Sequence, residues 1–181
     1  MRSFLILFIF FLPFGLHAQR PTDKGVTWIG GTASFSSMSS EVVTSTAVAL
    51  SPSANHFINN SIFLGGAFDW RRVSENGSSS FSLGLGPQVG VAFESEESVS
   101  IPYVAGGFRY LSSRSENNGI SALSRNGYDL FVAGGFNILA RESLGILIEA
   151  SYHIQSFEQG ASLNIFALSI GVVGILGSSE E

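Results

Sequence analysis

The chain of 181 residues has a formal net charge of −5 at pH 7 and contains no cysteine. The absence of cysteine excludes disulfide bonds and thiolate metal sites. The negative charge argues against nucleic acid as a partner, because phosphates require a basic surface. Charged residues make up only 13% of the sequence, about half of the ~25% typical of soluble domains. The chain therefore has too few charged side chains to cover the surface of a soluble domain.

Residues 1–18 have the pattern of a secretory signal peptide. The basic residue Arg2 is followed at 4–14 by the apolar run FLILFIFFLPF, which is too short to span a bilayer. The small residue Ala18 marks the expected cleavage site. A short membrane anchor is the alternative, but the helix-breaking Pro13 near the end of this run disfavours it.

After cleavage, residues 19–181 form one domain with a formal charge of 8 − 14 = −6, since Arg2 is removed. This domain is a series of segments that alternate between apolar and small or polar residues. Turns rich in Ser, Asn, Gly and Glu separate these segments. Such alternation predicts β-strands, and no sustained helical periodicity occurs after the signal peptide. We predict eight strands, in chain order 25–36, 42–52, 61–73, 80–93, 99–111, 127–139, 143–155 and 161–175.

The two faces of these strands differ in bulk rather than in charge. In FSLGLGPQVGVAF, residues 81–93, every odd position except Pro87 is apolar, whereas the even positions carry small or polar residues. A soluble barrel would place its apolar face inside and its charges outside. Here the bulky face must meet lipid, and the small residues face an interior that eight strands leave only just wide enough for side chains. The predicted fold is an all-β, eight-stranded, antiparallel up-and-down transmembrane β-barrel.

The segment lengths predict which ends of the strands lie outside the cell. If the first strand starts in the periplasm, the long segment 112–126 is extracellular and the tight ARES turn at 140–143 is periplasmic, as is typical of transmembrane barrels. Outward aromatic residues are expected to form girdles at the two membrane surfaces. The expected extracellular girdle is Trp70, Tyr110, Tyr128 and Tyr152, and the periplasmic girdle starts with Trp28 and Phe93.

Residues 50–65, LSPSANHFINNSIFLG, contain a proline that leaves one strand, a Phe-hydrophobe-polar-Asn turn, and a strand of alternating hydrophobes and Gly. This motif resembles the first periplasmic hairpin of the outer-membrane β-barrel domain family, the small eight-stranded barrels of OmpA/OmpX type in Gram-negative envelopes. Two features depart from the family: Asn55-His56 replace the commoner Gly-aromatic pair, and the chain ends in GILGSSEE rather than in a strand closed by an aromatic residue. The resemblance implies a location in the cell outer membrane. It also implies assembly by the barrel-assembly machinery and contact with outer-membrane lipid and lipopolysaccharide.

A structural or surface-interaction role is the function that the sequence favours. We expect a monomeric barrel with a filled interior and exposed extracellular loops, chiefly 112–126. A narrow pore for ions or small solutes is the first alternative, and a lipid-modifying enzyme is the second. Titratable residues on the inward face are expected to pair across the lumen. The alternative is that they form a gate or a small binding site at the mouth of the barrel. These residues are Asp69, Arg71, Arg109, Asp129, Glu149 and His153.

Catalysis, metals and cofactors are not expected. A hydrolase would need a nucleophile and a base on one face, and Ser156 lies on the face opposite to His153 and Glu149. Three scattered histidines form no metal site, and the acidic turn at 94–97 lacks the ligand spacing of an EF-hand. The glycines belong to strands and are not followed by the Lys-Ser/Thr of a phosphate loop.

Overall fold

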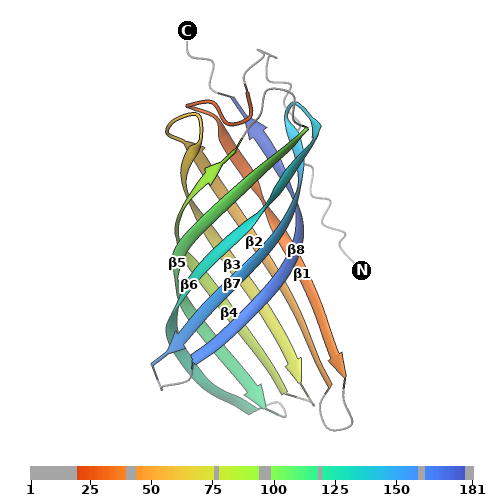
Figure 1. The fold of residues 1–181 in the computed structure, drawn as a ribbon. Coiled ribbons are helices and arrows are strands. Elements are labelled where there is room, and N and C mark those ends of the chain that lie inside the picture. The colour runs from red at the N-terminus through yellow and green to blue at the C-terminus, as the bar shows by residue number, and fades with distance from the viewer. Residues whose placement is uncertain are drawn as a thin grey trace, which may run out of the picture.

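The structure, a computed structural model, is a β-barrel of eight strands (Figure 1). It describes residues 20–39, 44–75, 78–93, 99–117, 120–158 and 162–177. The strands are β1 (Thr27–Ser39), β2 (Thr44–Phe57), β3 (Ile62–Glu75), β4 (Ser78–Ala92), β5 (Ser100–Asn117), β6 (Ile120–Arg141), β7 (Leu144–Phe157) and β8 (Ser162–Leu176). The predicted signal peptide and the acidic turn at 94–97 lie outside the described residues. Among the described residues, no helix is long and apolar enough to cross a membrane.

Each strand pairs antiparallel with its neighbours in sequence, and β8 pairs with β1 to close the barrel. Gly30 of β1 lies opposite Val173 of β8 in this closing pair. Closure pairs the backbone groups of each strand on both sides, which a strand in lipid requires. The predicted eight-stranded up-and-down barrel is confirmed.

The two ends of the barrel carry different connections. We call the end where β1 begins and β8 ends the turn end, drawn at the top of Figure 1, and the opposite end the loop end. At the turn end, residues 58–61 join β2 to β3, and residues 142–143 join β6 to β7. At the loop end, β5 and β6 run to 18 and 22 residues and form the longest hairpin.

The predicted loop 112–126 is wrong as a loop, because most of it continues β5 and β6. Ser112 lies opposite Asn126, and the pairing extends to Asn117 opposite Ile120, with a register shift after Arg114. Outside the lipid both faces of a hairpin can be polar, so this segment has no apolar alternation. The backbone ladder does not need that alternation.

Strand β2 is also longer than predicted, since it continues through Pro52 to Phe57. Proline lacks the N–H that a central strand donates. Pro52 pairs with Gly31 of β1, but the β2–β3 ladder is interrupted between Leu50 and Ser53. The proline therefore marks a local break in one ladder and does not end the strand.

The outer surface of the barrel is an apolar belt. From the turn end to the level of Trp70 and Tyr110, the outward positions of the described strands carry no charged residue, which a lipid-facing surface requires. Three of the expected girdle residues, Tyr110, Tyr128 and Tyr152, are exposed toward the loop end. Strand β8 has bulky residues at both parities, and the structure turns one set outward: Phe166, Leu168, Ile170 and Val172.

Residues 20–26 lie at the turn end of the barrel and hold the side chain of Trp28 inside the lumen. The Trp28 indole N–H donates to the carbonyl oxygen of Pro21 at 2.8 Å, and Gly25 turns the chain into β1 with a φ of 92° that favours glycine. Trp28 is only 3% exposed. Its expected place in an outward girdle is therefore wrong, because its polar N–H finds a partner inside. Phe93 is exposed at the turn end, as expected.

Candidate functional site

Aromatic, polar and titratable side chains at the inward positions of the strands fill the interior of the barrel. From the turn end to the loop end they form three layers, which we name the aromatic plug, the middle layer and the ionic layer. The aromatic plug is Trp28, Phe57, Phe63 and Tyr103; the middle layer is Asn55, Gln88 and Glu149; the ionic layer is Asp69, Arg109, Asp129 and His153.

The aromatic plug fills the turn end of the lumen with rings. The Trp28 and Phe57 ring centroids are 5.1 Å apart, and those of Phe57 and Phe63 are 5.5 Å apart, both edge to face. Tyr103 meets Trp28 edge to face at 6.3 Å. Gly90 leaves the space that the Phe63 ring occupies, since a Cβ at this position would collide with the ring. These edge-to-face contacts are the favoured geometry of packed aromatic rings.

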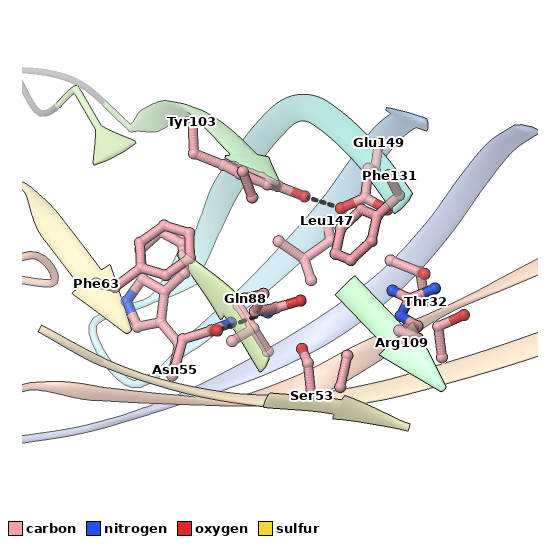
Figure 2. Close-up of a pocket in the computed structure, with 15 residues that line it drawn as sticks. Thr32, Ser53, Asn55, Phe63, Gln88, Tyr103, Arg109, Phe131, Leu147 and Glu149 are labelled. Carbon is pink, nitrogen blue, oxygen red and sulfur yellow. Dashed lines mark hydrogen bonds between the residues drawn. The ribbon is translucent and has the colours of Figure 1, made fainter. Parts of the chain in front are cut away.

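The middle layer surrounds a cavity of about 50 Å³ (Figure 2). Two hydrogen bonds link strands around it: the Gln88 amide donates to Asn55 Oδ1 at 2.6 Å, and the Tyr103 hydroxyl donates to Glu149 Oε2 at 2.8 Å. A water molecule needs roughly 10–15 Å³ of such space. The cavity therefore has room for a few water molecules and is too small for a sugar or an acyl chain.

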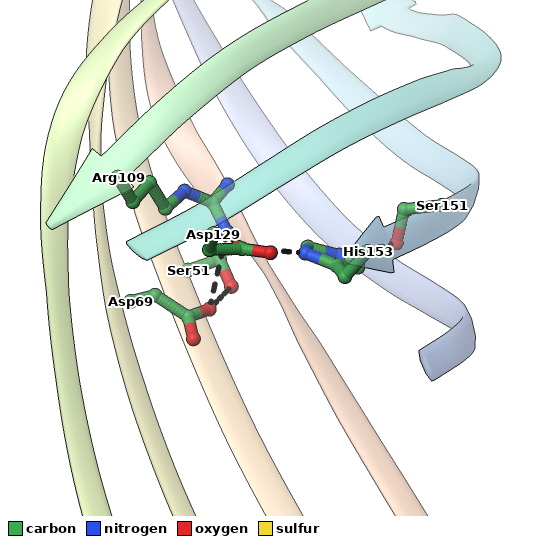
Figure 3. Close-up of polar contacts among 6 residues, drawn as sticks. All are labelled: Ser51, Asp69, Arg109, Asp129, Ser151 and His153. Carbon is green, nitrogen blue, oxygen red and sulfur yellow. Dashed lines mark hydrogen bonds and ion pairs between the residues drawn. The ribbon is translucent and has the colours of Figure 1, made fainter. Parts of the chain in front are cut away.

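In the ionic layer, one buried cation lies between two buried carboxylates (Figure 3). Arg109 Nη1 is 3.7 Å from Asp69 Oδ1 and 3.6 Å from Asp129 Oδ2, and these side chains are at most 6% exposed. These separations correspond to ion pairs, since direct hydrogen bonds are shorter. The hydroxyl of Ser51 donates to Asp69 Oδ1 at 2.5 Å, and Asp129 Oδ2 is 2.9 Å from Nδ1 of His153. Each carboxylate therefore has a second partner besides Arg109.

Phe131 holds the cation and the imidazole of this layer in place. The guanidinium carbon of Arg109 lies 4.1 Å from the centre of the Phe131 ring. The His153 ring stacks on Phe131 at 5.6 Å with an interplanar angle of 21°. A cation over an aromatic face is stabilised, and more so when it is desolvated. The ionic layer is therefore packed as well as paired.

The structure brings together four of the six predicted interior residues. Glu149 lies nearer the turn end and accepts a hydrogen bond from Tyr103, and Arg71 is half-buried beside a second cavity of about 20 Å³. Sequence reasoning missed the partners Tyr103 and Phe131, whose odd positions on their strands place them inside. Among the described residues, no group of His, Asp and Glu is close enough to hold a metal ion.

Ser151, His153 and Asp129 are aligned like the residues of a hydrolase triad. Ser151 Oγ is 3.1 Å from His153 Nε2, and the other ring nitrogen faces Asp129. The arrangement expected of a hydrolase from the sequence used Ser156 and Glu149 instead, but Ser156 lies on the outward face, opposite Tyr128. The spacing of two residues between Ser151 and His153 puts both on one face of β7 and could have identified this pair. The adjoining cavity of about 20 Å³ has room for about one water molecule.

The fold of the chain is similar to solved structures, although no protein-family model and no curated protein matches it. Neisserial surface protein A (NspA) has 17% identity and a TM-score of 0.60, covering 82% of this chain and 94% of its own. The outer membrane protein OprG from Pseudomonas aeruginosa has 12% identity and a TM-score of 0.60, covering 88% and 100%. The N-terminal β-barrel domain of Pseudomonas aeruginosa OprF has 13% identity and a TM-score of 0.58, covering 84% and 98%.

At these identities the similarity concerns the fold. Two features of this chain agree with it: the closed eight-stranded sheet and the uncharged apolar belt around it. The neighbours include outer-membrane proteins, in agreement with the predicted location in the cell outer membrane. The chain therefore has the fold of the small eight-stranded outer-membrane barrels.

Proposed function

We propose that the chain is an integral barrel of the Gram-negative outer membrane with a structural or surface-interaction role. Its lumen is closed, and its β5–β6 hairpin contacts the exterior. The observation that carries this proposal is that the aromatic plug and the ionic layer fill the lumen one after the other. A solute would have to displace the rings of Trp28 and Phe63 as well as the paired Arg109. Barrels of eight strands are filled in this way by their own side chains.

Single-channel recording tests the closed lumen against the narrow pore. The purified protein in a planar lipid bilayer is expected to give no sustained conductance steps. The variant Arg109→Met is expected to stay closed as well, because it opens the ionic layer and leaves the aromatic plug intact. Steady steps from the unmodified protein would favour the pore. Steps from the variant alone would make the ionic layer a gate.

Protease access tests the orientation. A protease site inserted between Asn117 and Ile120, at the tip of the β5–β6 hairpin, is expected to be cut on intact cells. The same site inserted at Glu142, in the turn between β6 and β7, is expected to be cut only after the outer membrane is permeabilised. Short turns of such barrels face the periplasm and longer connections face outward. The reverse pattern of cleavage would put the hairpin in the periplasm.

Hydrolysis by Ser151 is a second candidate, favoured by its alignment with His153 and Asp129. We expect instead that Ser151→Ala leaves the lipid composition of the cells unchanged. It should lower the free energy of unfolding by about 0.5–1.5 kcal/mol, because one buried hydrogen bond is lost. A serine-reactive fluorophosphonate should label neither protein. Labelling that Ser151→Ala abolishes, together with altered lipid, would replace the structural role by an enzymatic one.

A further inference from the structure

The ladder that closes the barrel holds only in the turn-end part of β1 and β8. Its last pair toward the loop end is Ala33 opposite Ile170. Beyond this pair, β1 still pairs with β2 and β8 still pairs with β7. No described residue pairs with the other edge of β1 at 34–39 or with the other edge of β8 at 162–169. The two strands run apart toward the loop end (Figure 1), and we call the space between these two edges the open seam.

The open seam begins inside the apolar belt. Tyr152 of β7, an exposed residue of the girdle toward the loop end, lies opposite Phe166 of β8. The last residue of β8 that pairs with β1 is Ile170, four residues nearer the turn end. At about 3.3 Å per residue, the unpaired edge therefore starts roughly 13 Å along the strand before the girdle. Lipid supplies no partner for backbone N–H and C=O groups, so an edge at this depth needs another strand to cover it.

Water in the lumen provides little of this cover at the depth of the ionic layer. Ser34 of β1 and Ser169 of β8 border the cavity of about 20 Å³ beside this layer. A cavity of this size has room for about one water molecule. One water molecule cannot replace a ladder of backbone hydrogen bonds along two strand edges.

Uncharged and largely apolar side chains flank the open seam. Phe35 of β1 is 71% exposed, and Phe166 and Leu168 of β8 are each 68% exposed. These are the largest exposed fractions among the bulky apolar residues that the structure describes. Neither 34–39 nor 162–169 contains a charged residue. Two copies of these edges therefore do not repel each other.

A second copy of the chain can supply both missing strands. Two barrels inserted in the same direction are related by a twofold axis along the membrane normal. Half a turn about this axis places β8 of each copy beside β1 of the other and keeps the antiparallel direction in which these strands pair within one chain. If the register of Ala33 opposite Ile170 continues, Phe35 of one copy lies opposite Leu168 of the second copy.

We propose that the chain forms a twofold dimer in the outer membrane, in which 34–39 of each copy pairs with 162–169 of the other. The two new ladders satisfy the backbone groups of both seams. A covered phenylalanine buries ~150–250 Å², so Phe35 and Phe166 of the two copies add several hundred Å² to the ladders, toward the ~1,200 Å² of a specific interface. The dimer replaces the monomer expected from the sequence, because the extent of β1–β8 pairing is visible only in the structure.

The mass of the folded protein tests the dimer. The purified protein is folded in a mild detergent, and native mass spectrometry measures the ratio of dimer to monomer at several protein concentrations. The unmodified protein is expected to form dimers, and Phe35→Ala/Phe166→Ala is expected to lower the association constant about tenfold. The matched control Phe108→Ala/Phe136→Ala, which removes two exposed rings from the paired strands β5 and β6, is expected to dimerise like the unmodified protein. Migration that changes on boiling shows that each variant is folded.

Crosslinking tests which strands meet. The chain contains no cysteine, so an introduced cysteine reports on one position. The variants Phe35→Cys and Leu168→Cys, with tags of different mass, are folded together in phosphatidylcholine vesicles and treated with a short bismaleimide. The mixture is expected to give a crosslinked dimer that contains both tags, and Phe35→Cys alone is expected to give none, because the twofold axis separates the two β1 strands. The matched mixture of Phe108→Cys and Phe136→Cys is expected to stay uncrosslinked.

Two results would overturn the proposal. One is a monomer mass for the unmodified protein at every concentration, which would leave the seam to another protein or to closure within one chain. The other is a dimer in which the Phe108→Cys and Phe136→Cys mixture crosslinks as well as the seam mixture, since the contact between barrels would then not involve the seam. The proposal goes beyond the proposed function, because neither conductance nor protease access depends on the number of copies.

Discussion

Replacing Arg109 by methionine is expected to lower the free energy of unfolding by about 3–5 kcal/mol. Arg109 is 5% exposed and is the cation between Asp69 and Asp129. Its removal leaves the buried carboxylates of Asp69 and Asp129 without the cation between them, which costs far more than the lost contacts. Urea titration of the barrel folded in phosphatidylcholine vesicles measures the change, with folded and unfolded forms separated by their gel mobility.

Two matched variants separate the buried charge from the loss of a large side chain. Arg71→Met removes a half-buried arginine of the same lumen and is expected to cost no more than about 1 kcal/mol. The triple variant Arg109→Met/Asp69→Asn/Asp129→Asn is expected to recover most of the loss, because no unpaired charge remains. If Arg109→Met and Arg71→Met were equally mild, the ion pairs of the ionic layer would contribute little to stability.

The second large effect is expected from a charge on the lipid face. Ile148 of β7 is 48% exposed on the outer surface, between Phe136 of β6 and Ile170 of β8. It lies midway between Leu144 at the turn end and the outward Tyr152. Ile148→Arg is therefore expected to cost about 2–4 kcal/mol, the range for arginine near the bilayer midplane. The yield of the heat-modifiable folded form in vesicles measures the effect.

A matched arginine at the membrane surface is the control for this effect. Ser156 lies on the same outward face of β7, opposite Tyr128 at the loop end. Ser156→Arg is expected to cost no more than about 1 kcal/mol, because the cost of arginine falls toward the interface. Equal damage from both variants would contradict the placement of this belt in lipid.

The strand number and the faces could be predicted from the sequence because lipid and lumen impose a period of two on each strand. Lipid requires an uncharged outer face, so a run such as residues 81–93 carries its apolar residues at alternate positions. The ends of β2, β5 and β6 could not be predicted this way. Outside the lipid, both faces of a hairpin can be polar, and strands there depend on backbone pairing alone. Strand β2 was predicted to end at Pro52, but the proline interrupts only the ladder between β2 and β3.

The aromatic residues of the lumen could not be predicted from one strand at a time. Phe63 is the register partner of Gly90, and Phe131 is the register partner of Gly107. In each pair, the missing Cβ of glycine leaves the space for the ring across the strand boundary, and a Cβ at Gly107 would come within 2.7 Å of Phe131. A large inward residue is therefore allowed only where the neighbouring strand has a small one. That condition depends on register, which parity does not give.

The ionic layer could likewise be predicted only in part from the sequence. Parity alone placed its charged residues inside, since charges on the lipid face are costly. Which of them meet depends on pairing: Arg109 is the register partner of Asp129, and Phe131 is that of His153. Glu149 lies on the same face of β7 as His153 but four residues closer to the turn end, where the Tyr103 hydroxyl donates a hydrogen bond to it. The role of Glu149 was therefore set by its depth along the barrel axis.

The opposite orientations of the two tryptophans give the chain two separate reporters of its own assembly. Trp28 lies inside against Phe57 and Phe63, and Trp70 lies on the outer face against Phe81. Because the chain contains no other tryptophan, brominated acyl chains can quench Trp70 directly, whereas Trp28 is shielded once β8 has joined β1. Fluorescence can therefore time two events separately: Trp70 reports insertion of the strands into the bilayer, and Trp28 reports closure of the barrel.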